Sequence, residues 1–126
     1  MKKIILTENA PAPIGPYSQA VLKGNTLYTS GQIAINPATG ELITESIEAE
    51  TEQVMQNMKA VLEAAGMTFE NVVKTTIFII DMNDFTKINT VYGSYFNEKT
   101  ASARETVQVA GLPKNVNIEI SMIAVL

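Results

Sequence analysis

Arg104 is the first residue of this sequence whose type points to chemistry. It is the single arginine of the chain, against eight lysines, and it follows the polar segment Asn97 to Ala103. A guanidinium holds a carboxylate or a phosphate through two parallel hydrogen bonds, a planar match that the point charge of lysine does not provide. We therefore treat Arg104 as a candidate anion-binding residue. The alternative is a surface arginine, or one that is paired structurally with a glutamate.

Glu119 is the second candidate, because it stands between Ile118 and Ile120 in a largely apolar segment. Partial burial of a carboxyl group disfavours its charged form and would raise its pKa. A carboxylate tuned in this way can orient or deprotonate a water molecule. The alternative is a glutamate on an edge strand that faces solvent.

The composition removes several classes of catalytic site. The chain contains no cysteine, histidine or tryptophan. Disulfides, thiolate nucleophiles, zinc sites built from Cys and His, and triads that depend on an imidazole are therefore excluded. The side chains that remain for acid and base chemistry are mainly glutamates, lysines and tyrosines, and this favours a catalytic carboxylate.

The charge balance and the hydropathy also restrict the partners of the protein. The formal net charge of -4 and the sequence pI near 4.8 disfavour nucleic-acid binding, which depends on clustered Lys and Arg side chains. The apolar run Ile4 to Leu6 is too short for a signal peptide, and no run reaches the length of a membrane span. We expect a single domain over residues 1–126 that works in the cytoplasm without a nucleic-acid or membrane partner.

Hydrophobic periodicity predicts the elements that must position these residues. Apolar residues at three- and four-residue spacing lie between Ser46 and Gly66, which is typical of an amphipathic helix with a serine cap and a glycine stop. A second helix is predicted to start near Asp84, and its apolar side would include Tyr95 and Phe96. Apolar and alternating segments predict six strands: Lys2 to Leu6, Gln19 to Lys23, Thr26 to Ile33, Val72 to Ile80, Glu105 to Ala110 and Val116 to Leu126.

The order β, β, β, α, β, α, β, β predicts an α+β fold with a single mixed sheet. Each helix connects two strands, so right-handed crossovers place both helices on one face of that sheet. In the last strand every second residue from Val116 to Ala124 is apolar, whereas Glu119 and Ser121 project to the other side. That other face is half polar and half apolar, and its own chain does not cover it. We expect it to pack against other subunits.

Ordered motifs run along the chain from the first strand to the last. They are Ile14-Gly15-Pro16-Tyr17-Ser18-Gln19-Ala20, Thr29-Ser30-Gly31-Gln32-Ile33, Asn57 to Gly66, Val73 to Ile79, Ala103-Arg104, Val107 to Pro113 and Ile118-Glu119-Ile120. In this series the chain closely resembles the RidA/YjgF family of enamine/imine deaminases. The number and the order of the motifs make the resemblance specific.

The resemblance implies a fold similar to chorismate mutase, assembled as a homotrimer with three clefts between subunits. It also implies hydrolytic deamination of reactive enamine and imine intermediates, in which 2-iminobutanoate and 2-iminopropanoate become 2-oxo acids and ammonia. The implied ligand is therefore a small 2-imino or 2-oxo acid. Neither a metal nor an organic cofactor is implied.

The resemblance also implies roles for individual residues. Arg104 matches the arginine that binds the substrate carboxylate, and Glu119 matches the glutamate that orients the attacking water. The positions that line the cleft in the family are matched by Tyr17, Ser30, Gly31, Asn89 and Thr106, and many members have a cysteine in place of Thr106.

The chain departs from the family pattern around these residues. The common Pro-Ala-Arg-Ser stretch is Ser102-Ala103-Arg104-Glu105 here, and a glutamate that is frequent two residues after Glu119 is Ser121. Loss of the proline loosens the segment that carries Arg104, and Glu105 adds a negative charge that could compete with the substrate. Strand alternation should send Glu105 to the opposite face, so we expect weakened rather than abolished binding.

Two other functions remain open at this point. The same cleft could serve a non-catalytic regulatory protein that binds a small carboxylate. A ribonuclease or translation inhibitor, a description that some relatives carry, is harder to reconcile with an acidic chain that has one arginine and no histidine.

Overall fold

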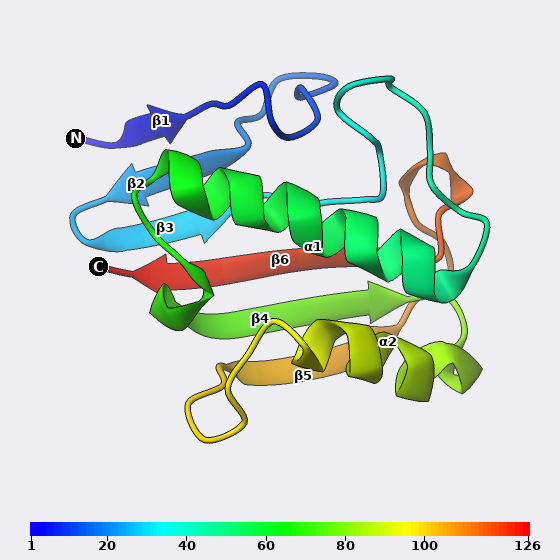
Figure 1. Ribbon diagram of the computed structural model, residues 1–126. Coiled ribbons are helices and arrows are strands. Elements are labelled where there is room, and N and C mark those ends of the chain that lie inside the picture. Colours follow the sequence, from blue (N-terminus) through cyan, green and yellow to red (C-terminus); the bar gives the residue numbers. More distant parts are fainter.

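The computed structural model describes all residues from Met1 to Leu126 and places six strands in one sheet under two helices (Figure 1). The strand order across the sheet is β1-β2-β3-β6-β4-β5. Only the β4 and β5 pair is parallel. The prediction of a single mixed sheet is confirmed. The strands are β1 (Lys3–Ile5), β2 (Ala20–Lys23), β3 (Thr26–Thr29), β4 (Val72–Ile79), β5 (Ala103–Gln108) and β6 (Ile118–Val125).

Two strand ends differ from the prediction near the candidate residues. β3 stops at Thr29, and further along the chain Gln32 forms only an isolated bridge with β6. β5 begins at Ala103 instead of Glu105, so Arg104 lies within the strand. Parallel pairing with β4 starts at Ala103, and this long-range contact has no counterpart in the local hydrophobic pattern.

The first helix, α1 (Ile47–Ala64), has the ends that the sequence predicts. Ser46 Oγ accepts a hydrogen bond from the backbone N–H of Ala49 at 3.0 Å, and Gly66 follows the helix with a φ of +73°. A serine cap satisfies one N–H group that the first turn leaves free, and glycine adopts the left-handed conformation without a steric penalty. No helix of the structure combines the length and the apolar composition that crossing a membrane requires.

The second helix, α2 (Phe85–Gly93), is shorter than predicted. It follows the short 3-10 helix η2 (Met82–Asp84), whereas Tyr95 and Phe96 lie beyond its end. Their rings pack edge-on against Phe69, with ring centroids 5.2 and 5.4 Å apart. The apolar pattern that indicated a longer helix therefore reflects partial burial of two aromatic rings in a turn.

The core lies between the helices and one face of the sheet. Figure 1 shows α1 and α2 on the same side of the strands, as the crossover rule predicts. The alternation predicted for β6 is confirmed, because every second residue of that strand is buried. The largest fully buried apolar side chains of this core are Leu27, Met55, Met58, Leu62, Met67, Ile77, Ile79, Ile88, Ile118 and Ile120.

A buried carboxylate fixes the chain just before β6. Glu50 of α1 is fully buried, and its two oxygens accept hydrogen bonds from the backbone N–H and the side-chain amide of Asn117 at 2.7 and 2.8 Å. The preceding 3-10 helix, η3 (Pro113–Asn115), holds Lys114 and Asn115 at φ values of 55° and 57°. β6 therefore begins at Ile118, two residues later than predicted.

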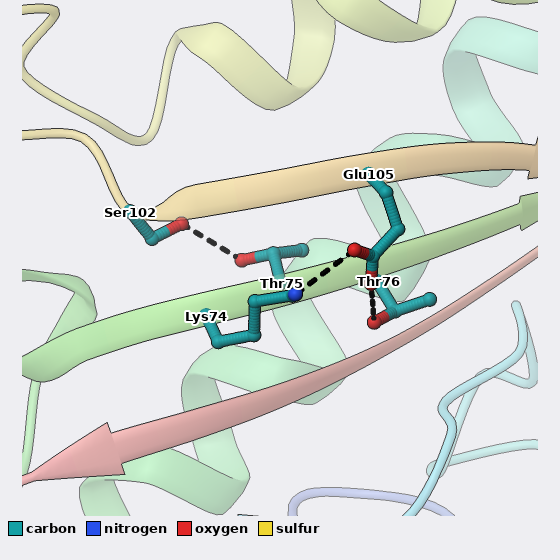
Figure 2. A network of polar contacts seen from close by, with 5 residues as sticks. All are labelled: Lys74, Thr75, Thr76, Ser102 and Glu105. Carbon is teal, nitrogen blue, oxygen red and sulfur yellow. Dashed lines mark hydrogen bonds and ion pairs between the residues drawn. The ribbon is translucent and has the colours of Figure 1, made fainter.

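The other face of the sheet is not covered by its own chain. Lys74 Nζ lies 2.9 Å from Glu105 Oε1 there, and Thr76 Oγ1 donates to Glu105 Oε2 at 2.7 Å. Figure 2 shows this carboxylate turned toward Lys74 and Thr76. A register shift at the start of β4 leaves Val73 half exposed, and Tyr28 of β3 is half exposed as well. This face is thus mixed in polarity, as predicted.

Candidate active site

Arg104 lies on the helix-covered face of β5. Its Cα pairs with that of Thr75, whose side chain is fully buried beneath the helices. The guanidinium carbon lies 5.1 Å from the centre of the Tyr92 ring and 5.6 Å from that of Phe85, both on α2, which is within cation–π range. Arg104 Nη1 donates to Asn89 Oδ1 at 2.7 Å. No other hydrogen bond or ion pair engages this guanidinium, so its remaining N–H groups are free to bind an anion.

A hollow of about 420 Å³ opens beside this guanidinium, and its wall includes Asn89, Tyr92, Ser102 and Arg104. Thr106 follows two residues later on the same face of β5, paired with the core strand β4. Its Oγ1 is buried and has no hydrogen-bond partner. Arg104 and Thr106 thus lie on the helix-covered face of β5, and Asn89 of α2 contacts Arg104 from the helix above them.

Glu119 lies on the uncovered face of the sheet, because its two neighbours in β6 point into the core. Its carboxyl group lines a second hollow, of about 430 Å³, together with Tyr17, Ser30 and Gly31. Partial burial removes water from the charged form and raises the pKa of the Glu119 carboxyl group, in agreement with the expectation from the sequence. A carboxylate in such surroundings is suited to accept a proton from water.

The Glu119 side chain packs directly against Gly31. A Cβ atom at Gly31 would lie 2.7 Å from Glu119 Cδ and 2.9 Å from Glu119 Cγ. Non-bonded carbon atoms do not approach that closely, so any larger residue would displace the carboxyl group. The glycine therefore permits the close approach that places Glu119 in the hollow.

Tyr17 and Ser30 are held in the same hollow by local hydrogen bonds. The Tyr17 hydroxyl accepts from the backbone N–H of Ile14 at 3.3 Å, and Ser30 Oγ donates to the carbonyl oxygen of Ser18 at 2.6 Å. Tyr17 remains half exposed. Its ring therefore stands at the rim of the hollow, where it can contact a ligand or another chain.

Gln19 organises the proline-containing loop that forms one wall of this hollow, and the sequence interpretation missed it. The side chain is almost fully buried. Its amide nitrogen donates to the carbonyl oxygens of Thr7, Ala10 and Pro11 at 3.0, 3.3 and 2.9 Å, and its oxygen accepts from the Thr7 N–H at 2.7 Å. A glutamine next to a strand carries no sequence signal for such a role, because its partners are backbone groups.

Lys114 is a second residue of the hollow that the sequence did not single out. It lines the hollow together with Glu119, and its backbone has a left-handed conformation. The turn-rich segment Gly111 to Asn115 predicts a loop at this point, but a loop assignment does not indicate the direction of a side chain. The hollow is therefore lined by a lysine as well as by a glutamate.

The two groups of candidate residues do not meet within one chain. Arg104, Asn89 and Thr106 lie on the helix-covered face, whereas Glu119 and Gly31 lie at the uncovered face, and the sheet separates them. One small ligand cannot contact Arg104 and Glu119 of the same protomer. A site that uses both residues must combine two protomers.

The departures around Arg104 have structural counterparts. Glu105 points to the face opposite Arg104, as predicted, and hydrogen bonds from Lys74 and then Thr76 lower its pKa. The Glu105 carboxylate is therefore bound to Lys74 and Thr76 and does not face the hollow beside Arg104. On the other face Ser102 Oγ lies 3.0 Å from Thr75 Oγ1, so this residue is tied to the sheet by its hydroxyl group.

Glu119→Gln is expected to raise the free energy of unfolding at neutral pH. The folded protein holds the Glu119 proton more tightly than the unfolded chain, so the stability of wild type falls as the pH rises from the ordinary value of 4.5 through the raised pKa. Above that window the half-buried charge is a penalty that the amide removes. Denaturant unfolding should show a gain for the variant at neutral pH and almost none at acidic pH.

Glu105→Gln provides the control with the opposite sign. The lowered pKa of Glu105 means that its ionised form stabilises the fold at neutral pH, and this contribution disappears as the pH falls through the lowered pKa. The amide variant should therefore be slightly less stable than wild type at neutral pH. An equal effect of Glu119→Gln at neutral and acidic pH would exclude burial of the charge as the cause.

The chain is similar to known proteins over nearly its whole length. A family model described as Endoribonuclease L-PSP matches residues 7–126. The 2-iminobutanoate/2-iminopropanoate deaminase of Escherichia coli strain K12 is 51% identical over 127 residues, which cover 99% of this chain and 98% of the relative. The solved structure of the YjgF gene product of E. coli has a TM-score of 0.92 at 51% identity and covers 98% of each chain. E. coli TdcF, solved with bound serine, has a TM-score of 0.93 at 45% identity, again with 98% of each chain covered.

These similarities extend from the first strand to the last, and the solved structures share the sheet and the two helices. The family model covers both hollows and every candidate residue described above. The resemblance drawn from the ordered motifs is therefore confirmed: the chain belongs to the RidA/YjgF family.

Proposed function

We propose that this protein hydrolyses 2-imino acids, such as 2-iminobutanoate and 2-iminopropanoate, to 2-oxo acids and ammonia. The observation that carries the proposal is the 51% identity, over 99% of the chain, to a relative that is named for this activity. The side chains support it, because Arg104 offers free N–H groups to a carboxylate and the raised pKa of Glu119 suits a proton acceptor. The serine bound to TdcF, a small molecule with a carboxylate, supports a ligand of this class.

The proposed reaction needs one anion-binding group and one base. Arg104 binds the carboxylate of the imino acid and fixes the position of the imine carbon. Glu119 accepts a proton from a water molecule whose oxygen forms a bond to that carbon, and passes this proton to the nitrogen, which gives an adduct with one hydroxyl and one amino group. Glu119 then takes the proton of the hydroxyl group and delivers it to the amino group, and the carbon–nitrogen bond breaks as the carbon–oxygen double bond forms. The products are ammonia and the 2-oxo acid.

We propose that the complete site forms between subunits of a homotrimer. The two hollows lie on opposite faces of one protomer, so a neighbouring chain must bring its Arg104 to the hollow that contains Glu119. The uncovered face of the sheet supports such packing, because half-exposed apolar side chains such as Tyr28 and Val73 alternate with polar groups there. In a cyclic trimer each interface is identical, so three equivalent sites would result.

The alternatives raised by the sequence have less support. A regulatory protein that only binds a carboxylate is not favoured, because the similar curated proteins include deaminases at 51% identity. The family description names an endoribonuclease, but the chain has a net charge of -4, one arginine and no histidine. Phosphate backbones are bound mainly by clustered Lys and Arg side chains, so an RNA substrate fits this surface poorly.

A coupled assay tests the proposed activity. A threonine dehydratase generates 2-iminobutanoate, and semicarbazide competes for the imine while 2-oxobutanoate formation is followed. Added protein should accelerate release of the 2-oxo acid and reduce the semicarbazide adduct. Absence of any acceleration at high protein concentration, together with intact pyruvate binding, would instead support the regulatory alternative.

Mixing two inactive variants tests the site between subunits. At substrate concentrations well below KM, Arg104→Ala and Glu119→Gln homotrimers should each be nearly inactive. When the two chains are unfolded together and refolded in equal amounts, about one site in four should combine an intact Arg104 with an intact Glu119 from its neighbour. Activity should therefore recover to about a quarter of the wild-type value. No recovery in proven mixed trimers would place both residues of each site in one protomer.

Gly31→Ala is expected to lower kcat about tenfold or more, because the new methyl group would occupy the space of the Glu119 carboxyl carbon. The φ angle at Gly31 is not left-handed, so the change acts through this contact and not through backbone strain. Gly111→Ala is the matched control, since a Cβ atom at Gly111 meets nothing within 4 Å. Steady-state rates with 2-iminobutanoate should separate the two variants. Equal rates would show that the position of the Glu119 carboxyl group is not critical.

A further inference from the structure

Three hydroxyl groups form a closed cluster beneath Arg104. The Tyr92 hydroxyl donates to Thr75 Oγ1 at 3.0 Å, Ser102 Oγ lies 3.0 Å from Thr75 Oγ1, and the Tyr92 and Ser102 oxygens are 3.3 Å apart. The members come from α2, from β4 and from the residue just before β5. Figure 2 shows the link between Ser102 and Thr75, on the side of the strands away from the Lys74 and Glu105 pair. We call this the hydroxyl cluster.

Two members of the hydroxyl cluster are buried, and the third lies in the wall of the hollow beside Arg104. Thr75 is 0% and Tyr92 is 4% exposed, and Ser102 is half-buried. A buried hydroxyl needs a hydrogen-bond partner, and each member of the cluster finds its partners in the other two. Removal of one hydroxyl group would therefore deprive each of the other two members of a hydrogen-bond partner.

The hydroxyl cluster is joined to Arg104 in two ways. The Tyr92 ring carries one of the three hydroxyl groups and lies 5.1 Å from the guanidinium carbon. Ser102 stands two residues before Arg104 in the chain, and the Thr75 Cα pairs with that of Arg104 across the sheet. Thr75 of β4 is thus linked both to the Tyr92 ring beside the guanidinium and to the backbone segment that carries Arg104.

We propose that Ser102 is a positioning residue for Arg104, acting through its hydrogen bonds to Thr75 and Tyr92. The hydroxyl group anchors the end of the polar loop 97–102 on β4, and this sets the direction in which the Arg104 side chain leaves the strand. Asn89 holds the guanidinium from the other side. This inference rests on the proposed function only in the role of Arg104 as the group that binds the substrate carboxylate.

Because Arg104 is the single arginine of the chain, nitrogen-15 NMR tests this inference directly. A single arginine Nε–H signal is expected, and its heteronuclear NOE would report the order of the Arg104 side chain on the picosecond-to-nanosecond timescale. Ser102→Ala should lower this NOE clearly, and Ser102→Thr, which keeps a hydroxyl group, should restore it. An NOE for Ser102→Ala that equals the wild-type value would overturn the inference.

Two adjacent threonines supply a matched pair of variants. Thr75→Val removes the central hydroxyl group of the cluster, whereas Thr76→Val removes a hydroxyl group that serves Glu105 on the other face. Only Thr75→Val should lower the NOE of Arg104. Similar NOE values in both variants would show that order at Arg104 does not depend on the cluster, and would overturn the inference even if Ser102→Ala were poorly folded.

Kinetics separates positioning from a purely structural role. Ser102→Ala should raise the KM for 2-iminobutanoate about fivefold and leave kcat within about twofold, because the anion-binding group is disordered while the base is untouched. A purely structural role would lower the unfolding midpoint and change neither KM nor the NOE. If wild type shows no deaminase activity, the proposed function fails, and the NMR comparison still decides the role of Ser102.

Discussion

Replacing Arg104 by alanine is expected to lower kcat/KM for 2-iminobutanoate about a hundredfold to a thousandfold. Asn89 is the only hydrogen-bond partner of the guanidinium within the chain, so loss of Arg104 removes two charge-assisted hydrogen bonds to the substrate carboxylate and leaves no buried partner unsatisfied. Most of the loss should appear in KM, because the base and its water are unchanged. Steady-state kinetics with 2-iminobutanoate generated in situ would measure it.

Arg104→Lys and Lys87→Ala are the controls for this prediction. Lysine keeps the charge but not the planar pair of donors, so Arg104→Lys should lie between wild type and Arg104→Ala. Lys87 is an exposed cation on α2, the helix that supports Arg104, and its removal should leave KM within about twofold. A KM for Arg104→Ala equal to that of Lys87→Ala would mean that the substrate carboxylate is bound elsewhere.

Glu119→Gln is expected to lower kcat about a hundredfold or more and to leave KM nearly unchanged. Glutamine fills the same space in the hollow but cannot accept a proton from water, and removal of a general base typically costs a factor of this size. The variant should at the same time be more stable than wild type at neutral pH, because its side chain carries no half-buried charge. A lower kcat together with a higher free energy of unfolding would show that Glu119 serves catalysis and not stability.

Glu105→Gln makes the same chemical change on the same face of the sheet and should leave kcat within about twofold. Its carboxylate is held by Lys74 and Thr76, and its neighbour Arg104 points to the other side. If Glu119→Gln retained the wild-type kcat, orientation of the substrate by Arg104 alone would have to account for the catalysis.

Much of the fold could be predicted from local features of the sequence. Periodicity identified both helices and all six strands. Apolar residues at 3.6-residue spacing fall on one face only in a helix, and apolar residues at every second position fall on one face only in a strand. Ser46 and Gly66 marked the ends of α1 through side-chain and backbone preferences that act over a few residues. The predicted end of α2 was wrong, because the rings of Tyr95 and Phe96 pack against Phe69, which is distant in the sequence.

The sequence by itself determined the elements, the family motifs and the chemical types of Arg104 and Glu119, because these depend on residue identity and short-range spacing. Only the tertiary structure decided that these two side chains lie on opposite faces of the sheet, that Gly31 makes room for Glu119 and that Ser102 is bound to Thr75 and Tyr92. Those relations join residues that are distant in the chain. They depend on strand register and side-chain packing, which no local pattern encodes.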